Sequence, residues 1–266
     1  MNTLAEHGAT LLGGVLRKAE ALGGGNLSQI LRIRLADGRE AIVKNGPVPR
    51  TEAAMLRAIA ASGAPAPAVL AVSDEALVME PRPSGGSLSK AWESLGAAVA
   101  VLHQARGDRY GWAEDYAFGP VVIANDWSDD WPRFWGEHRL LCHAPHIPGA
   151  LARRVEALAA DLPSRLPARP APALLHGDLW TGNVLVHGGR ISGLIDPACA
   201  YGHAEADFAM LSLFDSPPPA FYAAYGPQEP GHGERRPIYQ LWPALVHLRL
   251  FGGGYRSLVE RLLSAV

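Results

Sequence analysis

Cysteine and clustered basic residues are both scarce in this chain of 266 residues. The two cysteines, Cys142 and Cys199, are too few for a disulfide framework and lack the Cys-x-x-Cys spacing of a zinc site. Lysine and arginine together number 24, against 26 aspartates and glutamates, and no basic run stands out. Because backbone binding of nucleic acid needs clustered positive charge, nucleic acid is not an expected partner.

Long apolar runs are absent as well. No stretch approaches the ~20 apolar residues that span a bilayer, and the first residues lack the pattern of a secretory signal. We therefore expect no membrane partner and a cytoplasmic location, where unpaired cysteines stay reduced. With 48% hydrophobic and 19% charged residues, the chain has the composition of an ordinary folded protein, either a monomer or a homodimer.

The first third of the chain has the patterns of a small antiparallel sheet. Thr3-Leu-Ala-Glu6 has the form of a capping box and predicts a helix that continues to about Leu22. Apolar residues then alternate with polar ones, and Asp37-Gly38 is a hairpin signal. The further elements predicted here are strands at 27–35, 40–45, 69–72 and 76–80 and a helix at 50–62.

Pro81-Arg-Pro-Ser-Gly-Gly86 is the clearest boundary, because it combines missing backbone donors with flexible glycines. Helical patterns dominate after it. We therefore predict an α+β, two-lobed fold: a β-rich lobe over 1–80, a hinge over 81–86, and a mostly helical lobe over 87–266. Within the second lobe, Arg106–Pro132 is rich in Trp, Tyr, Asp and Gly and is expected to be a long functional loop.

The most informative stretch is His176-Gly-Asp-Leu-Trp-Thr-Gly-Asn183, followed by Asp196-Pro197. In phosphoryl transfer a carboxylate accepts the proton of the attacking hydroxyl, and oxygen ligands hold a divalent metal on the nucleotide phosphates. Asp178 is the candidate base, and Asn183 and Asp196 are the candidate metal ligands. Magnesium accepts one or two protein oxygens and takes the rest from phosphates and water, so ATP and Mg²⁺ are the expected cofactors.

Candidate nucleotide-binding residues occur in the first lobe. Lys44 lies on the second predicted strand and could reach phosphates, and Glu52 in the next helix is its nearest acidic partner. Taken alone, Lys44 would more often be an ordinary strand-face lysine, but its position before a helix with a glutamate and ahead of the metal motif favours the phosphate role. Two further groups are weaker candidates, because a helix end or a strand end would explain them as well: Gly25 and Asn26 for the phosphates, and Met79, Glu80 and Arg82 for the adenine edge.

Another cluster, Tyr201-Gly-His-Ala-Glu205, follows the metal aspartate. His203 and Glu205 could face the acceptor, although a structural role for His203 fits as well. Asp207 is expected to accept hydrogen bonds from the backbone of the catalytic loop. Since Gly-x-Ser-x-Gly is absent, a serine hydrolase is not indicated.

These motifs resemble the fructosamine kinase (ketosamine-3-kinase) family, a branch of the aminoglycoside phosphotransferase and choline kinase superfamily. The resemblance rests on the stretch 174–183, Ile195-Asp-Pro-Ala198 and the motif 201–207. It also rests on Asp37-Gly-Arg39, Leu95–His103, Tyr110-Gly-Trp112, Trp127-Ser-Asp-Asp-Trp131 and Phe251-Gly-Gly-Gly-Tyr255. It implies a protein-kinase-like fold and ATP-dependent phosphorylation of a sugar hydroxyl on ketosamines, small or protein-bound, which frees the glycated amine.

The resemblance adds residues to the expected site. Trp180, Asp130 and Trp131 join the candidates for acceptor binding, and His176 joins Asp207 as support for the catalytic loop. The interval between Lys44 and Glu52 is shorter than expected for the family. Two other functions remain open: an aminoglycoside, choline or simple-sugar kinase, and a pseudokinase that only binds nucleotide.

Overall fold

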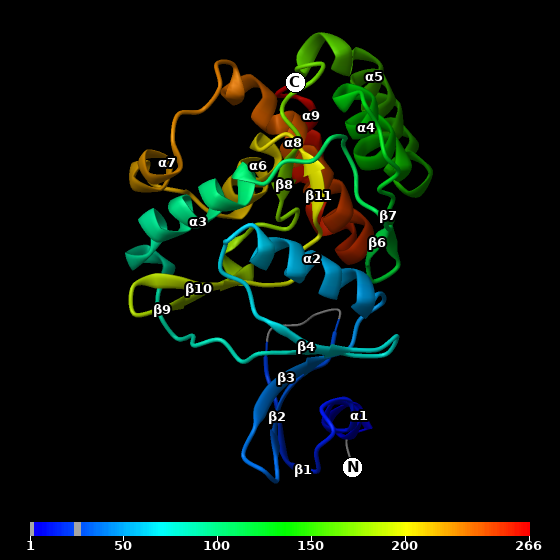
Figure 1. The fold of residues 1–266 in the computed structure, drawn as a ribbon. Coiled ribbons are helices and arrows are strands. Elements are labelled where there is room, and N and C mark those ends of the chain that lie inside the picture. The colour runs from blue at the N-terminus through cyan, green and yellow to red at the C-terminus, as the bar shows by residue number, and fades with distance from the viewer. Residues whose placement is uncertain (1–2, 24–27) are drawn as a thin grey trace.

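The computed structural model describes residues 3–23 and 28–266 and has the predicted α+β, two-lobed architecture. An antiparallel sheet forms the N-terminal part, and helices with short strand pairs form the rest (Figure 1). Gly25 and Asn26, the candidate phosphate-covering residues, lie outside the described ranges. Within those ranges no helix is both long and apolar enough to cross a membrane.

The N-terminal sheet has five strands in the order β1-β2-β3-β5-β4. Apolar side chains on one face of its strands pack with Leu4 and Ala5 of the first helix into a small core. The elements are α1 (Thr3–Leu11), β1 (Leu16–Ala21), β2 (Ile30–Leu35), β3 (Glu40–Lys44), β4 (Val69–Val72) and β5 (Leu77–Met79).

The predicted first helix was too long. It ends at Leu11, Gly13 takes a φ of +63°, and Leu16–Ala21 pair with β2 as an edge strand. The polar residues of β1 are mostly exposed along this strand. Backbone pairing with β2, which no local pattern reveals, therefore outweighed the helical spacing of the sequence.

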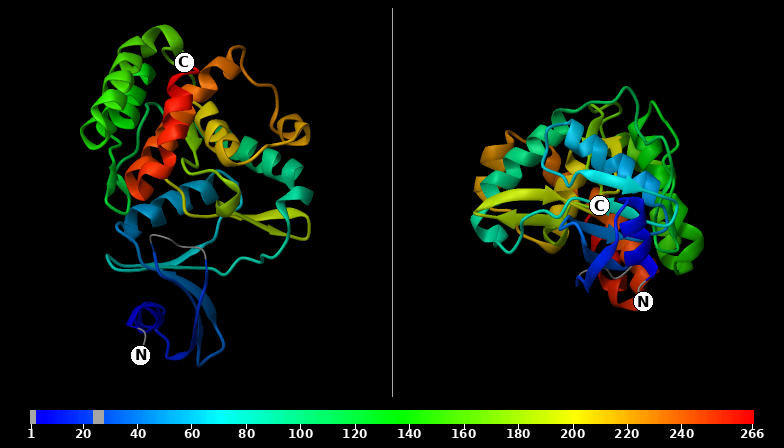
Figure 2. Two further views of the ribbon diagram at one scale, coloured as in Figure 1. Left: turned by 180° about the vertical axis from the view of Figure 1, so that it is seen from behind. Right: turned by 60° about the horizontal axis from the view of Figure 1, so that its bottom comes forward.

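Helix α2 (Pro49–Ala61) connects the two parts of the molecule. Its Ala53 and Leu56 side chains pack on the sheet with Leu77, whereas Met55 and Ile59 belong to the large core of the helical part. Figure 1 and the left view of Figure 2 show α2 between the sheet and the helices. The helix thereby positions the sheet over the site described below.

The helical part is built around a large aromatic core. Trp131, Trp135 and Tyr239 are at its centre, fully buried and in mutual contact. Residues 131–146 form a short α-helix, a π turn and a 3₁₀ segment in succession. The helices are α3 (Trp92–Gln104), α4 (Trp131–Trp135), α5 (Gly149–Arg165), α6 (Glu205–Phe214), α7 (Pro219–Tyr225), α8 (His232–Phe251) and α9 (Arg256–Leu263).

The expected loop at 106–132 contains a hairpin, β6 (Tyr116–Phe118) and β7 (Val121–Ile123). It reaches the N-terminal part, where the Glu114 carboxylate accepts a hydrogen bond from the Thr51 hydroxyl of α2 at 2.6 Å. Residues 81–86 run as extended chain beside the strands that follow the catalytic motif. There the Ser192 hydroxyl donates to the Pro83 carbonyl at 2.5 Å.

Two antiparallel strand pairs frame the catalytic motif. β8 (Ala173–Leu175) pairs with β11 (Ala200–Gly202), and β9 (Val184–His187) pairs with β10 (Arg190–Leu194). The motif leaves β8 and enters β9 through a 3₁₀ turn at Thr181–Asn183. β10 ends at Leu194, and Asp196 just after it comes back to the loop that carries Asp178 and Asn183.

Candidate active site

The catalytic loop turns sharply at Gly177. Its φ is +79°, and a Cβ atom there would lie 1.9 Å from the Ala198 carbonyl oxygen. Only glycine combines this backbone conformation with so close an approach. The turn brings the next residue, Asp178, to the wall of the cavity described below.

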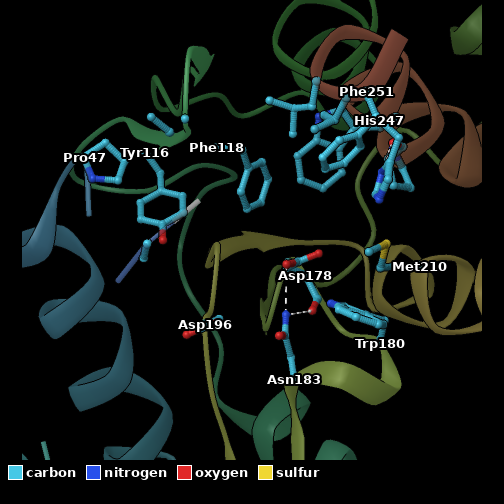
Figure 3. A pocket seen from close by; sticks show the side chains of 18 of the residues that line it. Pro47, Tyr116, Phe118, Asp178, Trp180, Asn183, Asp196, Met210, His247 and Phe251 are labelled. Carbon is cyan, nitrogen blue, oxygen red and sulfur yellow. Dashed lines mark hydrogen bonds between the residues drawn. The ribbon is translucent and has the colours of Figure 1, made fainter. Parts of the chain in front are cut away.

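Asp178 is held by Asn183. The Asn183 side-chain amide donates hydrogen bonds at 2.9 Å to the Asp178 carbonyl and to the Asp178 Oδ2 atom. Because the amide nitrogen is used in this way, the amide oxygen of Asn183 is the atom left to bind a cation. Figure 3 shows these two residues with Asp196 on one side of the cavity.

Asp196 has a φ of +52°, the only positive value among the described non-glycine residues. The backbone beside it is fixed by two contacts at 3.0 Å, one from the Ile195 amide to the Asn183 carbonyl and one between His176 Nε2 and the Ile195 carbonyl. A non-glycine residue in this region is strained and persists only where its surroundings enforce it. In this conformation the Asp196 carboxylate reaches Lys44 of the N-terminal part.

Lys44 meets both carboxylates that surround it. Its ammonium lies 2.9 Å from Glu52 Oε1 and 2.8 Å from Asp196 Oδ1, and Lys44 and Glu52 are both buried. Burial alone would lower the pKa of Lys44, but the two carboxylates outweigh it and raise that pKa. The short sequence interval between Lys44 and Glu52 therefore still allows a direct ion pair.

Asp207 anchors the catalytic loop by hydrogen bonds to its backbone. Its carboxylate accepts hydrogen bonds from the His176 amide at 2.7 Å and the Gly177 amide at 2.9 Å. His103 Nε2 lies 3.0 Å from the same carboxylate. Although burial opposes it, this bonding keeps the pKa of Asp207 below its usual value. A buried carboxylate thus fixes the two residues that precede Asp178.

The pKa of Asp178 is raised to about 7, mainly because the carboxyl is removed from water and secondarily because Asp196 and Asp207 are near. The hydrogen bond from Asn183 opposes part of this shift. A group that binds and releases protons near neutral pH is suited to general-base chemistry.

A cavity of about 460 Å³ lies between the two parts of the molecule. Lys44, Asp178, Asn183 and Asp196 form its polar side, and Trp180 lies beside them (Figure 3). Ser28, Ile30 and Pro47 of the N-terminal part also line the cavity. The rest of the wall is mostly apolar and aromatic and comes from the β6–β7 hairpin, α6, α8 and the turn after α8. Its larger side chains are Tyr116, Phe118, Met210, Phe214, Trp242, Val246, His247, Leu250, Phe251 and Tyr255.

Several predicted residues do not line this cavity. Met79, Glu80 and Arg82 lie outside it, and the Arg82 side chain donates to the Ser192 carbonyl at 2.6 Å. Asp130 accepts a hydrogen bond from the Arg133 amide and caps α4, while Trp131 is fully buried. The structure thus uses Asp130 for helix capping and Trp131 for core packing and brings neither to the cavity.

His203 and Glu205 also lie outside the cavity. His203 is buried, and its Nδ1 atom lies 2.8 Å from the Tyr239 hydroxyl, which accepts a hydrogen bond from the Trp131 indole. Glu205 forms an ion pair with Arg235, with one contact at 2.8 Å. His203 and Glu205 are both buried and make their polar contacts away from the cavity.

Potential ligand atoms of His203, Glu205 and Glu229 lie within 4.8 Å of one another. His203 Nδ1 faces the Tyr239 hydroxyl, whereas His203 Nε2 is buried without a hydrogen-bond partner among the described residues and lies 3.5 Å from Glu229 Oε2.

Most of the aromatic wall was missed from the sequence. Phe251 and Tyr255 belong to a motif that carried the family resemblance, and this was the one signal that could have indicated them. Met210, Trp242 and His247 stand in helical patterns whose apolar residues are equally typical of a core. Their position in the cavity depends on how α6 and α8 cross.

The fold and the site together define a two-lobed, kinase-like protein in which Lys44, Asp178, Asn183 and Asp196 share one cavity wall. The family model for fructosamine kinase matches residues 7–266, and the chain belongs to this family.

Two curated relatives and one solved structure are especially similar. A candidate ketoamine kinase of Synechocystis is 38% identical over 201 residues, 70% of this chain and 66% of the relative. The chloroplastic protein-ribulosamine 3-kinase of Arabidopsis thaliana is 36% identical over 192 residues, 68% of this chain and 58% of the relative. The chain thus spans less than two thirds of these relatives. A crystal structure of a candidate fructosamine-3-kinase from Thermobifida fusca has a TM-score of 0.91 and 32% identity, covering 100% of this chain and 98% of that one.

Proposed function

We propose that this protein is an ATP-dependent kinase that phosphorylates a sugar hydroxyl of ketosamines. The observation that carries the proposal is the position of Asp178, held by Asn183 beside Asp196 and Lys44 in a cavity large enough for a small acceptor. Family membership and relatives described as ketoamine and protein-ribulosamine kinases support the same substrate class.

In the proposed reaction the acceptor hydroxyl attacks the γ-phosphorus of ATP, its proton passes to the Asp178 carboxylate, and the bond to the β-phosphate oxygen breaks to release ADP. Asn183 orients Asp178 through its two hydrogen bonds. Asp207 acts through the backbone of 176 and 177 and is a positioning residue. This division places the proton acceptor on a rigid loop, as general-base catalysis requires.

We propose that the Asn183 amide oxygen and the Asp196 carboxylate hold a divalent cation, with Mg²⁺ the natural choice for oxygen ligands and phosphates. These two oxygen ligands fit a divalent cation. The Asn183 side-chain nitrogen already donates to Asp178, which leaves the amide oxygen for the cation, and the Asp196 carboxylate is partly exposed to the cavity. When bound, the cation neutralises charge on the phosphates. Lys44 is the proposed contact to the nucleotide phosphates, with Glu52 as its ion-pair partner. The other proposed nucleotide contacts are Gly25, Asn26, Met79, Glu80 and Arg82. Residues 81–86 are the proposed hinge.

An acceptor panel monitored by ADP release tests the proposal. Fructosamine, ribulosamine and erythrulosamine adducts should be phosphorylated, whereas choline, aminoglycosides and free sugars should give little turnover. Phosphorylation at the hydroxyl next to the ketose carbonyl carbon would make the adduct decompose and free the amine. Turnover confined to an aminoglycoside, choline or simple sugar would replace the proposed substrate class, and nucleotide binding without any turnover would indicate a pseudokinase.

A further inference from the structure

The cavity contains a second feature that the phosphoryl chemistry does not use: a group of aromatic side chains around His247. The ring centroid of His247 lies 5.0 Å from Phe214, 5.5 Å from Phe251 and 4.9 Å from Tyr255. These residues come from the end of α6, the end of α8 and the turn that follows it, and all four line the cavity. We call them the aromatic subsite.

The exposure of this group indicates that it binds something. Among the described residues, Trp127, Trp180, Phe214 and Phe251 are the exposed Trp and Phe side chains, and the last three line this one cavity. Phe214 is 42% exposed and Phe251 is 47% exposed. Apolar surface gathered in a concave site is typical of a ligand pocket rather than of a free surface.

The hydrogen bonding of His247 decides which kind of ligand fits. His247 Nδ1 lies 2.7 Å from the Pro243 carbonyl oxygen, which can only accept, so Nδ1 carries the proton. Nε2 therefore presents a lone pair, and the described residues offer it no hydrogen-bond partner. A ligand group that meets this atom must be a donor.

The charges on the cavity wall also favour a positively charged ligand. Lys44, Asp178 and Asp196 are the charged residues on the wall, and Lys44 is already paired with Asp196 and Glu52. No cationic side chain of the described wall approaches the aromatic subsite to repel a positive ligand. Burial lowers the pKa of His247 and favours its neutral form, so the imidazole adds no opposing charge.

We infer that Phe214, His247, Phe251 and Tyr255 bind the protonated secondary amine of the acceptor. The aromatic faces attract the cation, and His247 Nε2 accepts its N–H. Ring faces within about 6 Å of a cation stabilise it electrostatically, and aromatic cages for alkylated ammonium groups work in this way. The inference rests on the proposed function, since a ketosamine carries such an amine close to its sugar hydroxyls. Figure 3 shows His247 and Phe251 facing Asp178 and Trp180 from the other side of the cavity.

The aromatic subsite explains how a kinase could distinguish a ketosamine from the corresponding free sugar as a substrate. Both offer the same hydroxyls to Asp178, but only the ketosamine places a cation beside them. Specificity would then come from the amine and not from the sugar alone.

The test compares two ligands that differ at one atom: an N-alkyl ketosamine and its ether analogue, in which oxygen replaces the amine and removes both the positive charge and the N–H donor. Binding is measured by calorimetry and turnover by ADP release. We expect wild type to bind the amine about tenfold more tightly than the ether, and Phe251→Leu to remove most of this preference while ether binding changes little. His247→Gln, which keeps an acceptor near Nε2, should retain more of the preference than His247→Leu.

Trp127→Leu is the matched control, because it removes an exposed tryptophan outside the cavity and should leave both affinities unchanged. Circular dichroism checks that each variant is folded. Equal binding of amine and ether by wild type, or equal losses for both in Phe251→Leu, would overturn the aromatic subsite. Preferential binding of the amine without turnover would instead contradict the proposed kinase activity and leave the subsite supported.

Discussion

Individual residues in this site are constrained by geometry that leaves few substitutes. Gly177 turns beneath the Ala198 carbonyl, Asp196 stays in a strained backbone region, and Asn183 spends its amide nitrogen on Asp178. Each constraint serves the orientation of a carboxylate. Substitutions at these positions therefore separate loss of chemistry from loss of structure.

Asp178→Asn tests the chemistry. It keeps the size of the side chain but removes the proton acceptor, so kcat should fall at least about a hundredfold. Nucleotide affinity should change little, because Asp178 is not among the proposed nucleotide contacts. Steady-state kinetics together with an ATP titration measures both. Activity within a few fold of wild type would show that another group accepts the proton.

Gly177→Ala tests the structure of the loop. The added Cβ would clash with the Ala198 carbonyl and force a strained φ, so the free energy of unfolding should fall by about 3 kcal/mol or more. Gly188→Ala is the control, since its φ is +56° but nothing lies within 4 Å of the added atom, and it should cost about 1 kcal/mol. Urea unfolding compares the two. Equal losses would mean that the close approach to Ala198 is unimportant.

At the level of secondary-structure elements, α6 performs two tasks with opposite ends. Asp207 in its first turn holds the catalytic loop, and Phe214 at its last residue contributes to the aromatic subsite. The helix thus links the loop that carries Asp178 to the aromatic side of the cavity. α2 has a similar role between the sheet and the helices, since it carries Glu52 to Lys44.

Asp207→Asn tests the anchoring by α6. The amide offers one acceptor in place of two and sets an N–H against a backbone donor, so we expect a loss of about 3 kcal/mol in stability. A fall in kcat should accompany it, with the KM for ATP nearly unchanged, because the loop carrying Asp178 loses its support. Asp108→Asn, at an exposed aspartate outside the cavity, is the control and should change neither quantity. A stable, fully active Asp207→Asn protein would contradict the anchoring role.

For the whole molecule, the proposed nucleotide site joins the two parts, since Lys44 comes from the sheet and Asp196 from the helical part. ATP should therefore stabilise the protein only when a divalent cation is present. At a concentration one hundred times Kd the gain should be about 2.7 kcal/mol. A thermal-shift titration with Mg²⁺ or with chelator measures it. An equal shift with chelator would contradict the roles of Asn183 and Asp196.

Buried histidines should make the molecule sensitive to acid. Burial, followed by nearby positive charge, lowers the pKa of His143 and of His203 to about 3, from 6.5. Below pH 6.5 the unfolded chain binds protons that the folded chain refuses. Each residue should thus cost about 1.4 kcal/mol of stability per pH unit between about 6.5 and 3. Above pH 6.5 neither contributes a slope.

Urea unfolding between pH 7.5 and 5 checks this effect in His143→Leu, which should lose less stability with acid than wild type. His146→Leu replaces an exposed histidine nearby and should keep the wild-type slope. The same slope in all three proteins would show that His143 does not resist protonation.

The order of residues along the chain was sufficient for the two-lobed α+β fold and for the polar side of the site. Asp178, Asn183 and Asp196 lie within one short strand–turn–strand unit, so their proximity follows from local structure. Lys44 and Glu52 belong to adjacent elements, and their pairing could be anticipated for the same reason. Local patterns failed at residues 16–21, where pairing with β2 replaced helix.

Tertiary packing alone decided the acceptor side. The cavity wall draws residues from the hairpin at 116–123, from α6 and from α8, and no local pattern indicates that these elements converge. The type of a side chain also does not reveal its surroundings: Trp131 lies fully buried, whereas Trp180 is 38% exposed in the cavity. The polar residues of the site are close in sequence, so their grouping could be predicted from the sequence alone. The aromatic wall of the cavity is built from residues far apart in sequence, so only the tertiary structure reveals it.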